Sequence, residues 1–234
     1  MSDPTPDTPD RRDGPDSAVF DIDGTLLDSN YHHALAWSRA FQRAGLSVAV
    51  WDIHRHIGMG GDRLVAAVAG DDAERQHGDD LRAAWEEEFD AIAGETRPLA
   101  GARDLLAELG RRGLTVVLAS SGIPKHTQRA LDLLHADEHA DAATSSEDAE
   151  ASKPDPELLD EALARVGAER GFLVGDAVWD VEAATREGVP TVGLLSGGYG
   201  RAELLDAGAV AVYRDPADLL GHLDEALGTL SARD

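Results

Sequence analysis

The sequence predicts an α/β fold: a Rossmann-like parallel sheet core with helices on both faces, interrupted after its first strand by a small all-helical insertion. From residue 98 onwards, short apolar runs alternate with helical segments of about ten residues. This alternation is typical of a parallel sheet that is covered on both faces. One apolar run precedes the region, and the residues between them, 30–97, have helical periodicity and no convincing strand.

The elements follow in order along the chain. Residues 1–16 are rich in Pro and Asp and lack apolar periodicity, so we expect a disordered tail. The apolar run 17–20 is expected to form a buried strand. In the insertion, apolar residues recur at helical spacing in two groups: Ala34, Trp37, Phe41 and Ala44, then Leu81, Trp85, Phe89 and Ile92.

After Pro98, helices are expected at 102–112 and 124–134, from residue 156, and at 178–187. Strands are expected at 114–119, 142–144, 171–174, 191–194 and 209–213. The predicted domains are therefore an α/β catalytic core formed by residues 15–29 and 98–234, and a helical domain formed by residues 30–97.

Composition excludes several classes of function. The net charge is −24, from 45 acidic and 21 basic residues, which argues against binding to nucleic acid or to anionic membrane surfaces. Cysteine is absent, so disulfides and thiolate metal sites are excluded. No run of about 18 apolar residues and no secretory leader pattern occurs, and we expect a soluble, cytoplasmic protein. The oligomeric state is not predicted.

Polar residues follow four of the predicted strands. They are Asp21 and Asp23, Ser120 and Ser121, Lys153, and Asp176 and Asp180. Ligands of open parallel sheets bind at the carboxyl ends of the strands, so we expect these groups to meet in one crevice. An aspartate after a strand is often only a turn or helix-capping residue, and Ser120 or Lys153 alone would be unremarkable. The combination in this order favours a site.

The predicted crevice would hold four carboxylates and a single lysine. Carboxylates so close together repel each other, and some would stay protonated unless a cation joined them. A hard divalent ion with oxygen ligands resolves this conflict, and Mg²⁺ is the common choice where phosphate is also bound. Lys153 is one of only two lysines in the chain, the other being Lys125.

Four segments together resemble the motifs of haloacid dehalogenase-like hydrolases. They are DxDGTLLDS from Asp21, VVLAS ending at Ser120, KPDP from Lys153, and GDxxxD from Gly175. The resemblance extends over nearly the whole chain from Ala18 onwards. It implies a phosphatase type with a small helical cap, similar to phosphoglycolate phosphatases and β-phosphoglucomutases, and the insertion corresponds to that cap.

The resemblance also implies roles for the residues. Asp21 would attack phosphorus and form an aspartyl-phosphate, and Asp23 would act as general acid and then as general base. Mg²⁺ would be held by Asp21, the backbone carbonyl of Asp23 and Asp176. Asp180 would act through water or by orienting Lys153. Ser120 would donate a hydrogen bond to the phosphoryl group, with Ser121 and Gly122 as neighbouring substrate-binding residues, and Lys153 would neutralise charge.

Other members of the resembled superfamily are less consistent with these residues. The true dehalogenases lack an acid at the position of Asp23, and the phosphonate hydrolases need a cap lysine, whereas residues 30–97 contain none. A phosphomutase, in which a sugar accepts the phosphoryl group, uses the same motifs and stays an alternative. An acidic binding protein without catalysis is an alternative of another class.

The substrate is expected to be a small phosphorylated metabolite, such as a sugar phosphate or phosphoglycolate. Loop 54–62 is the candidate substrate-facing segment of the insertion, with Arg55, His56 and Gly58 as candidate contacts; a simple helix-capping turn is the alternative. The Gly-rich stretch 197–200 is expected to be a turn. Five histidines show no metal-ligand spacing and are expected at surface or helix positions: His32, His33, His126, His135 and His139.

Overall fold

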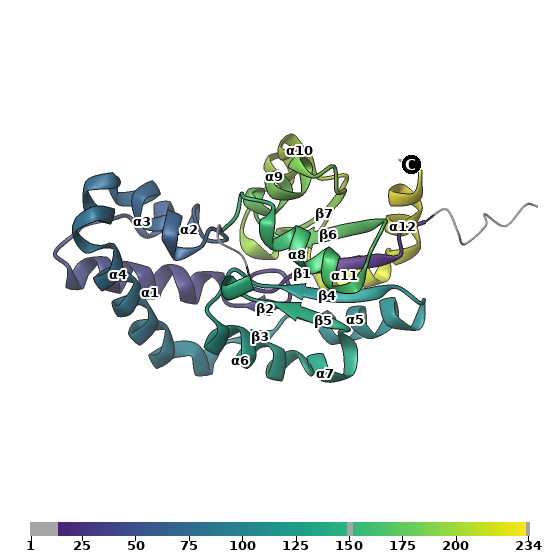
Figure 1. Ribbon diagram of the computed structural model, residues 1–234, viewed down its shortest axis with the longest axis horizontal. Helices are drawn as coiled ribbons and strands as arrows, with labels where there is room; N and C mark the ends of the chain where they lie inside the picture. The colour runs from purple at the N-terminus through teal and green to yellow at the C-terminus, as the bar shows by residue number, and fades with distance from the viewer. Residues whose placement is uncertain (1–13, 149–151, 233–234) are drawn as a thin grey trace, which may run out of the picture.

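The computed structural model describes residues 14–148 and 152–232 of the chain. Within these residues, a parallel six-stranded sheet has the order β5-β4-β1-β6-β7-β8 (Figure 1). Its strands are β1 (Ser17–Asp21), β4 (Thr115–Ala119), β5 (Ala142–Thr144), β6 (Gly171–Gly175), β7 (Thr191–Leu194) and β8 (Ala211–Tyr213). The predicted α/β fold with a parallel sheet is confirmed, and each predicted strand is present with ends shifted by at most two residues.

Helices cover both faces of the sheet. The first face is covered by α5 (Ala102–Arg111), α6 (Pro124–Leu134), α7 (Ala136–His139), α11 (Pro216–Gly221) and α12 (Leu223–Ser231). The second face is covered by α8 (Glu157–Val166), α9 (Val178–Arg186) and α10 (Arg201–Ala207). Side chains alternate along β1 between the two faces, so Phe20 packs into the first core and Val19 into the second.

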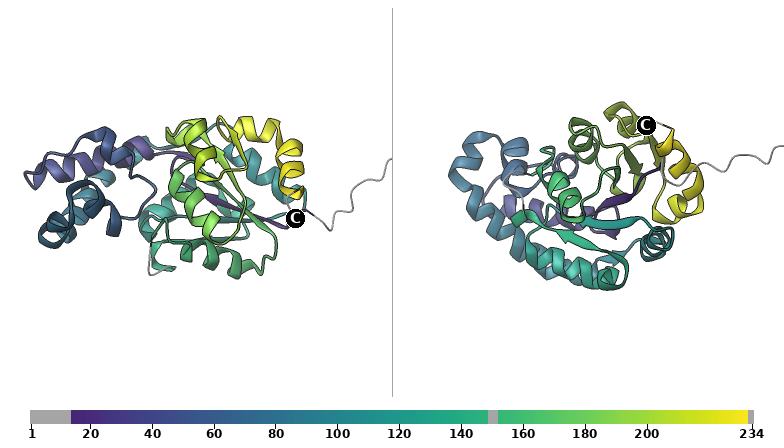
Figure 2. Two further views of the ribbon diagram at one scale, coloured as in Figure 1. Left: turned by 90° about the horizontal axis from the view of Figure 1, so that it is seen from above. Right: turned by 45° about the vertical axis from the view of Figure 1, so that its right-hand side comes forward.

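The stretch between residues 30 and 95 is helical throughout its named elements and is called the helical segment below. It contains α1 (Asn30–Arg43), α2 (Val50–His54), α3 (Gly61–Ala69), α4 (Asp71–Ile92) and the 3₁₀ turn η1 (Ala93–Glu95). Figures 1 and 2 show it at one end of the molecule, beside the sheet rather than on either face. Its own core contains Trp37 and Trp85, whose rings stack with centroids 5.3 Å apart.

A two-stranded antiparallel ribbon, which the sequence did not predict, joins the helical segment to the sheet. It consists of β2 (Leu27–Asp28) and β3 (Arg97–Pro98). The two chain crossings between the parts thus lie side by side. A strand of two residues leaves no periodic pattern, so a sequence reading misses such an element.

The two ends of the described chain lie at the end of the molecule opposite the helical segment (Figure 1). Of the predicted tail, residues 1–13 lie outside the described residues, while the backbone of Asp16 is hydrogen-bonded to Arg170 and Thr115. Among the described helices, none is both long and apolar enough to cross a bilayer.

Candidate active site

The strands deliver three carboxylates to one point. β1 ends at Asp21, β6 is followed directly by Asp176, and Asp180 lies in the first turn of α9. One carboxylate oxygen from each of the three lies within 4.8 Å of those of the other two, and all three side chains are buried. This is the convergence expected at the carboxyl ends of parallel strands.

Lys153 is the ammonium partner of this cluster. Its side chain is buried, and its Nζ lies 2.7 Å from Asp180 Oδ1 and also bonds Asp21 Oδ1. Asp180 is itself fixed, because its Oδ2 accepts a hydrogen bond of 3.1 Å from the backbone of Ala177 at the start of α9. One positive charge thus lies between two of the three carboxylates.

Asp176 is held by two side chains from the loop and helix that follow β1. Thr25 Oγ1 donates to Asp176 Oδ1 at 2.7 Å, and Asn30 Nδ2 donates to Asp176 Oδ2 at 2.7 Å. Gly197 packs against the same carboxylate, because a Cβ built there would lie 1.7 Å from Asp176 Oδ2. These contacts orient a carboxylate whose partners among the described residues are two neutral groups, so a second cation is the natural partner for it.

The carboxylate of Asp23 is turned away from this cluster. Its Oδ1 accepts a hydrogen bond of 2.5 Å from Ser29 Oγ and lies 3.2 Å from His33 Nε2. The His33 ring stacks on Phe89 of α4 with centroids 3.9 Å apart. His33 is on a helix as predicted, but it is not a surface residue: it is buried against Asp23, so the sequence reading missed its place in the site.

The turn after Asp23 depends on Gly24. Its φ is +82°, and a Cβ there would lie 2.3 Å from Asn30 Nδ2, so only glycine fits. The bend brings Thr25, Ser29 and Asn30 back toward the strand end, within reach of Asp23 and Asp176. Ser29 and Asn30 were not singled out from the sequence, although the motif that begins at Asp21 contains the first and adjoins the second.

Burial controls the protonation of the cluster. Burial raises the pKa of Asp21 to about 7, although Lys153 opposes the shift. Burial, together with the charges of Asp21 and Asp180, raises the pKa of Asp176 well above its ordinary value. Burial acts in the same direction on Asp23, but the interactions with His33 and Ser29 outweigh it and hold the pKa of Asp23 below its ordinary value.

The donor set fits a hard divalent cation. Asp21, Asp176 and Asp180 offer oxygen ligands, and one ammonium group compensates three carboxylates only in part. The raised pKa values of Asp21 and Asp176 indicate charge that a cation would stabilise. Mg²⁺ matches this combination of oxygen ligands.

A small pocket of about 60 Å³ lies beside Asp21 and Asp23 and is called the phosphate pocket below. Ser121 and Gly122 line it from the loop after β4, and Gly58 lines it from the helical segment. Ser120 lies just behind, buried, with its Oγ accepting a hydrogen bond of 3.0 Å from the backbone of Gly122. The residues that the sequence placed after β1 and β4 therefore do meet.

Arg55 and His56 lie elsewhere in this structure. Arg55 Nη2 bonds Glu203 Oε1 at 2.5 Å, and its guanidinium carbon lies 4.1 Å from the centre of the Tyr199 ring. His56 Nδ1 bonds the carbonyl of Asp52 at 2.8 Å, and its ring stacks near Trp179. Neither residue lines the phosphate pocket, because the docking of α2 on the core uses both side chains. Arg55 thus joins the two parts of the molecule.

Comparisons with known proteins identify the family of this chain. The family model of haloacid dehalogenase-like hydrolases matches residues 15–188. A tyrosine-protein kinase, PtkA, of Mycobacterium tuberculosis is 30% identical over 92% of this chain and 74% of its own. A phosphoglycolate phosphatase of Mesorhizobium japonicum is 28% identical over 74% of this chain and 80% of its own.

Among solved structures, a hydrolase from Pseudomonas syringae superposes with a TM-score of 0.85. It is 36% identical and covers 89% of this chain and 98% of its own. The family model spans most of the chain and includes Asp21, Ser120, Lys153 and Asp176. The chain belongs to the haloacid dehalogenase-like hydrolases.

Proposed function

We propose that this hydrolase is a Mg²⁺-dependent phosphatase that cleaves a small phosphorylated metabolite through an aspartyl-phosphate on Asp21. The observation that carries the proposal is the buried cluster of Asp21, Asp176 and Asp180, in which Asp21 and Asp180 contact Lys153. The family match and the relatives named phosphoglycolate phosphatase support the same reaction class. In this proposal, residues 15–29 and 98–234 form the catalytic core, and residues 30–97 form its cap.

Asp21 is the proposed nucleophile. Its carboxylate oxygen attacks phosphorus, the bond from phosphorus to the ester oxygen breaks, and the leaving alcohol departs toward the helical segment. Lys153 bonds Asp21 directly and is placed to neutralise the charge that gathers on the transferring group. Ser120, Ser121 and Gly122 follow β4, whose end pairs with that of β1, and in this proposal they hold the phosphoryl oxygens.

The proposed Mg²⁺ would be held by the side chains of Asp21 and Asp176 and by the backbone carbonyl of Asp23, with Asp180 acting through water or through Lys153. When bound, the ion supplies positive charge that lowers the repulsion between a phosphate dianion and the carboxylates. Thr25 and Asn30 orient Asp176 for this purpose through bonds of 2.7 Å each.

Asp23 is the proposed acid and base. It protonates the leaving oxygen in the first half-reaction and removes a proton from water in the second. Ser29 and His33 hold its carboxylate in one orientation at 2.5 and 3.2 Å. In the free protein they also keep its pKa low, and the negative charge of a bound phosphate ester would raise the pKa toward the value that proton donation requires.

Hydrolysis of p-nitrophenyl phosphate tests the proposal. The wild type with Mg²⁺ should release p-nitrophenol, EDTA should abolish the release, and Asp21→Asn should be inactive while remaining folded. A folded wild type that hydrolyses no phosphate monoester in a metabolite panel would refute the phosphatase, and would favour an acidic binding protein.

The same assay separates hydrolysis from phosphoryl transfer. PtkA is named a tyrosine-protein kinase, and such a kinase requires a nucleotide donor and a tyrosine acceptor. Incubation with ATP and a tyrosine-containing peptide therefore tests for kinase activity. A mutase would convert one sugar phosphate into an isomer without releasing phosphate. Stoichiometric release of inorganic phosphate without any nucleotide supports the phosphatase, whereas dominant transfer to peptide or sugar would refute it.

A further inference from the structure

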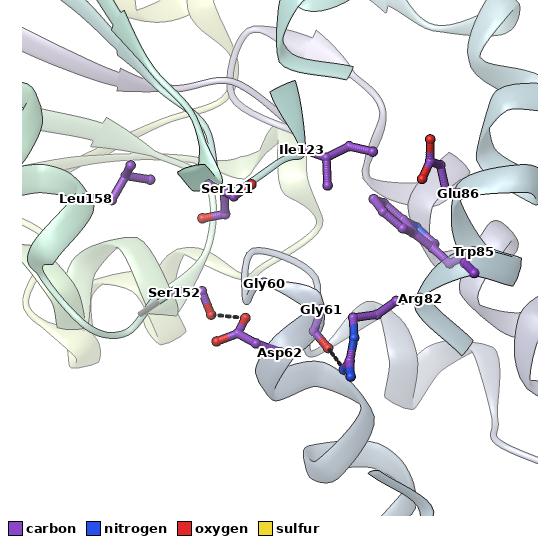
Figure 3. A pocket seen from close by; sticks show the side chains of 12 residues that line it. Gly60, Gly61, Asp62, Arg82, Trp85, Glu86, Ser121, Ile123, Ser152 and Leu158 are labelled. Atoms are coloured by element: carbon purple, nitrogen blue, oxygen red, sulfur yellow. Dashed lines mark hydrogen bonds between the residues drawn. The ribbon is translucent and has the colours of Figure 1, made fainter. Parts of the chain in front are cut away.

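A second, larger cavity adjoins the phosphate pocket and is called the leaving-group cavity below (Figure 3). Its volume is about 490 Å³, and it lies between the helical segment and the loops of the core. It shares Gly60, Gly61, Trp85 and Ser121 with the phosphate pocket. An ester whose phosphorus lies beside Asp21 therefore extends its organic part into this cavity.

The walls of the cavity combine an aromatic ring with small polar groups. Trp85 of α4, Ile123 and Leu158 supply apolar surface, as Figure 3 shows. The hydroxyls of Ser146 and Ser152 belong to the same lining. An apolar ring beside hydrogen-bonding groups suits a molecule that has both C–H faces and hydroxyls.

Among the residues that the structure describes, the lining offers no free positive charge. Arg82 is its one cation among the described residues, and its guanidinium is already shared. It bonds Glu74 at 2.9 Å and Asp79 at 2.8 Å, and it also bonds the carbonyl of Gly61 at 3.0 Å. Two carboxylates thus compensate one arginine, which leaves little attraction for an anion on the substrate.

The remaining charges of the lining are negative. Asp62 accepts a hydrogen bond of 2.6 Å from Ser152, lies 3.9 Å from Arg63, which it shares with Asp155, and has further oxygen lone pairs to offer. Glu86 faces the cavity from α4 and lies 3.2 Å from Lys125, which also bonds Asp90. A carboxylate on the organic part of the substrate would meet Asp62 and Glu86 and be repelled, whereas hydroxyls would donate hydrogen bonds to them.

We propose that the leaving-group cavity selects phosphate monoesters of neutral, polyhydroxylated alcohols, such as sugars or sugar alcohols, and rejects esters that carry a carboxylate there. Trp85 packs against the carbon skeleton, while Asp62 and Glu86 accept hydrogen bonds from substrate hydroxyls. This selectivity rests on the proposed phosphatase function and names its substrate class. The proposed substrate class differs from that of the relatives named phosphoglycolate phosphatase, because phosphoglycolate carries a carboxylate.

Matched substrate pairs test the selectivity. Glucitol 6-phosphate and gluconate 6-phosphate differ in one terminal CH₂OH or carboxylate, as do glycerol 3-phosphate and 3-phosphoglycerate. With the wild type and Mg²⁺, kcat/KM should be at least tenfold higher for the neutral member of each pair. Equal values, or a preference for the carboxylate, would overturn the selectivity. Turnover of p-nitrophenyl phosphate in the same experiment separates this failure from a failure of the phosphatase itself.

The variant Glu86→Gln locates the selectivity in the cavity. It removes one negative charge from the lining and leaves Lys125 paired with Asp90, so the ratio of kcat/KM for the neutral member to kcat/KM for the carboxylate should fall at least threefold. Glu87→Gln is the matched control, because Glu87 is the next residue on α4, is 68% exposed and pairs with Arg43 outside the cavity. An unchanged ratio in Glu86→Gln, or an equal fall in Glu87→Gln, would overturn the assignment to this lining.

Discussion

Replacing Asp21 by asparagine should stabilise the metal-free protein at pH 8. The same replacement should abolish the activity that the wild type has with Mg²⁺. Asparagine keeps the shape of the side chain and removes its charge. In the metal-free protein, burial and Asp180 raise the pKa of Asp21 from 3.8 to about 7, against the opposing effect of Lys153. The folded state therefore binds a proton more tightly than the unfolded state. The stability that this proton contributes is complete below pH 3.8 and is lost as the pH rises through 7.

The size of the effect follows from that difference. A rise in the pKa of Asp21 from 3.8 to about 7 corresponds to about 4 kcal/mol of folding free energy. This is the upper limit of the stability that Asp21→Asn gains at pH 8. The amide of asparagine accepts from Lys153 through only one oxygen, so we expect a gain of about 2 kcal/mol. For a protein of this size, that gain raises Tm by about 4 to 8 °C. At pH 5 the gain should shrink, because Asp21 of the wild type is protonated there.

Thermal unfolding of both proteins in EDTA, at pH 5 and pH 8, measures this gain. Mg²⁺ should then stabilise the wild type at pH 8 more than Asp21→Asn, because a ligand stabilises only the folded state that binds it. An Asp21→Asn protein that is no more stable than the wild type at pH 8 in EDTA would refute the reasoning. Equal stabilisation of both proteins by Mg²⁺ would refute the place of Asp21 among the ligands.

Three further predictions concern the partners of the cluster. His33→Gln should lower kcat about 10- to 100-fold in protein that is still folded at the assay temperature, since a hydrogen bond to a charged group contributes about 1.5 to 3 kcal/mol. Lys153→Arg should lower kcat/KM at least 100-fold, because a planar guanidinium does not fit the buried space between Asp21 and Asp180. Gly197→Ala should raise the Mg²⁺ concentration for half-maximal activity at least tenfold, because its Cβ displaces Asp176, whereas the exposed Gly221→Ala should not.

The sheet and the strand-end residues were predictable because they depend on local patterns. Strands buried on both faces appear as apolar runs, and parallel strands end at the same edge, so Asp21, Ser120 and Asp176 had to lie near one another. The strand order β5-β4-β1-β6-β7-β8 was not predicted, because no local pattern states which strands are neighbours. The weak run at 142–144 does form an edge strand, paired with β4.

The partners of the site were harder to foresee. His33 lies ten residues from Asp23 on the next helix, and its burial depends on Phe89 of α4, which packs over it. Arg55 reaches Glu203 across 148 residues of sequence. The contact of His33 with Asp23 and the contact of Arg55 with Glu203 exist only once the helical segment has docked on the core. A sequence pattern records which face of a helix is apolar, but it does not record where that helix docks.

The docking also bears on Asp176, a proposed metal ligand, because Asn30, which holds Asp176, and His54 of α2 both contact the carbonyl of Gly197. Asn30 Nδ2 bonds Asp176 at 2.7 Å and this carbonyl at 3.5 Å, while His54 Nε2 of α2 bonds the same carbonyl at 2.8 Å. A movement of α2 away from the core would therefore release a loop that packs directly on Asp176. His54→Ala should weaken activation by Mg²⁺ although His54 touches no carboxylate of the cluster. Activation by Mg²⁺ at the wild-type concentration in this variant would show that the docking and the metal ligands are independent.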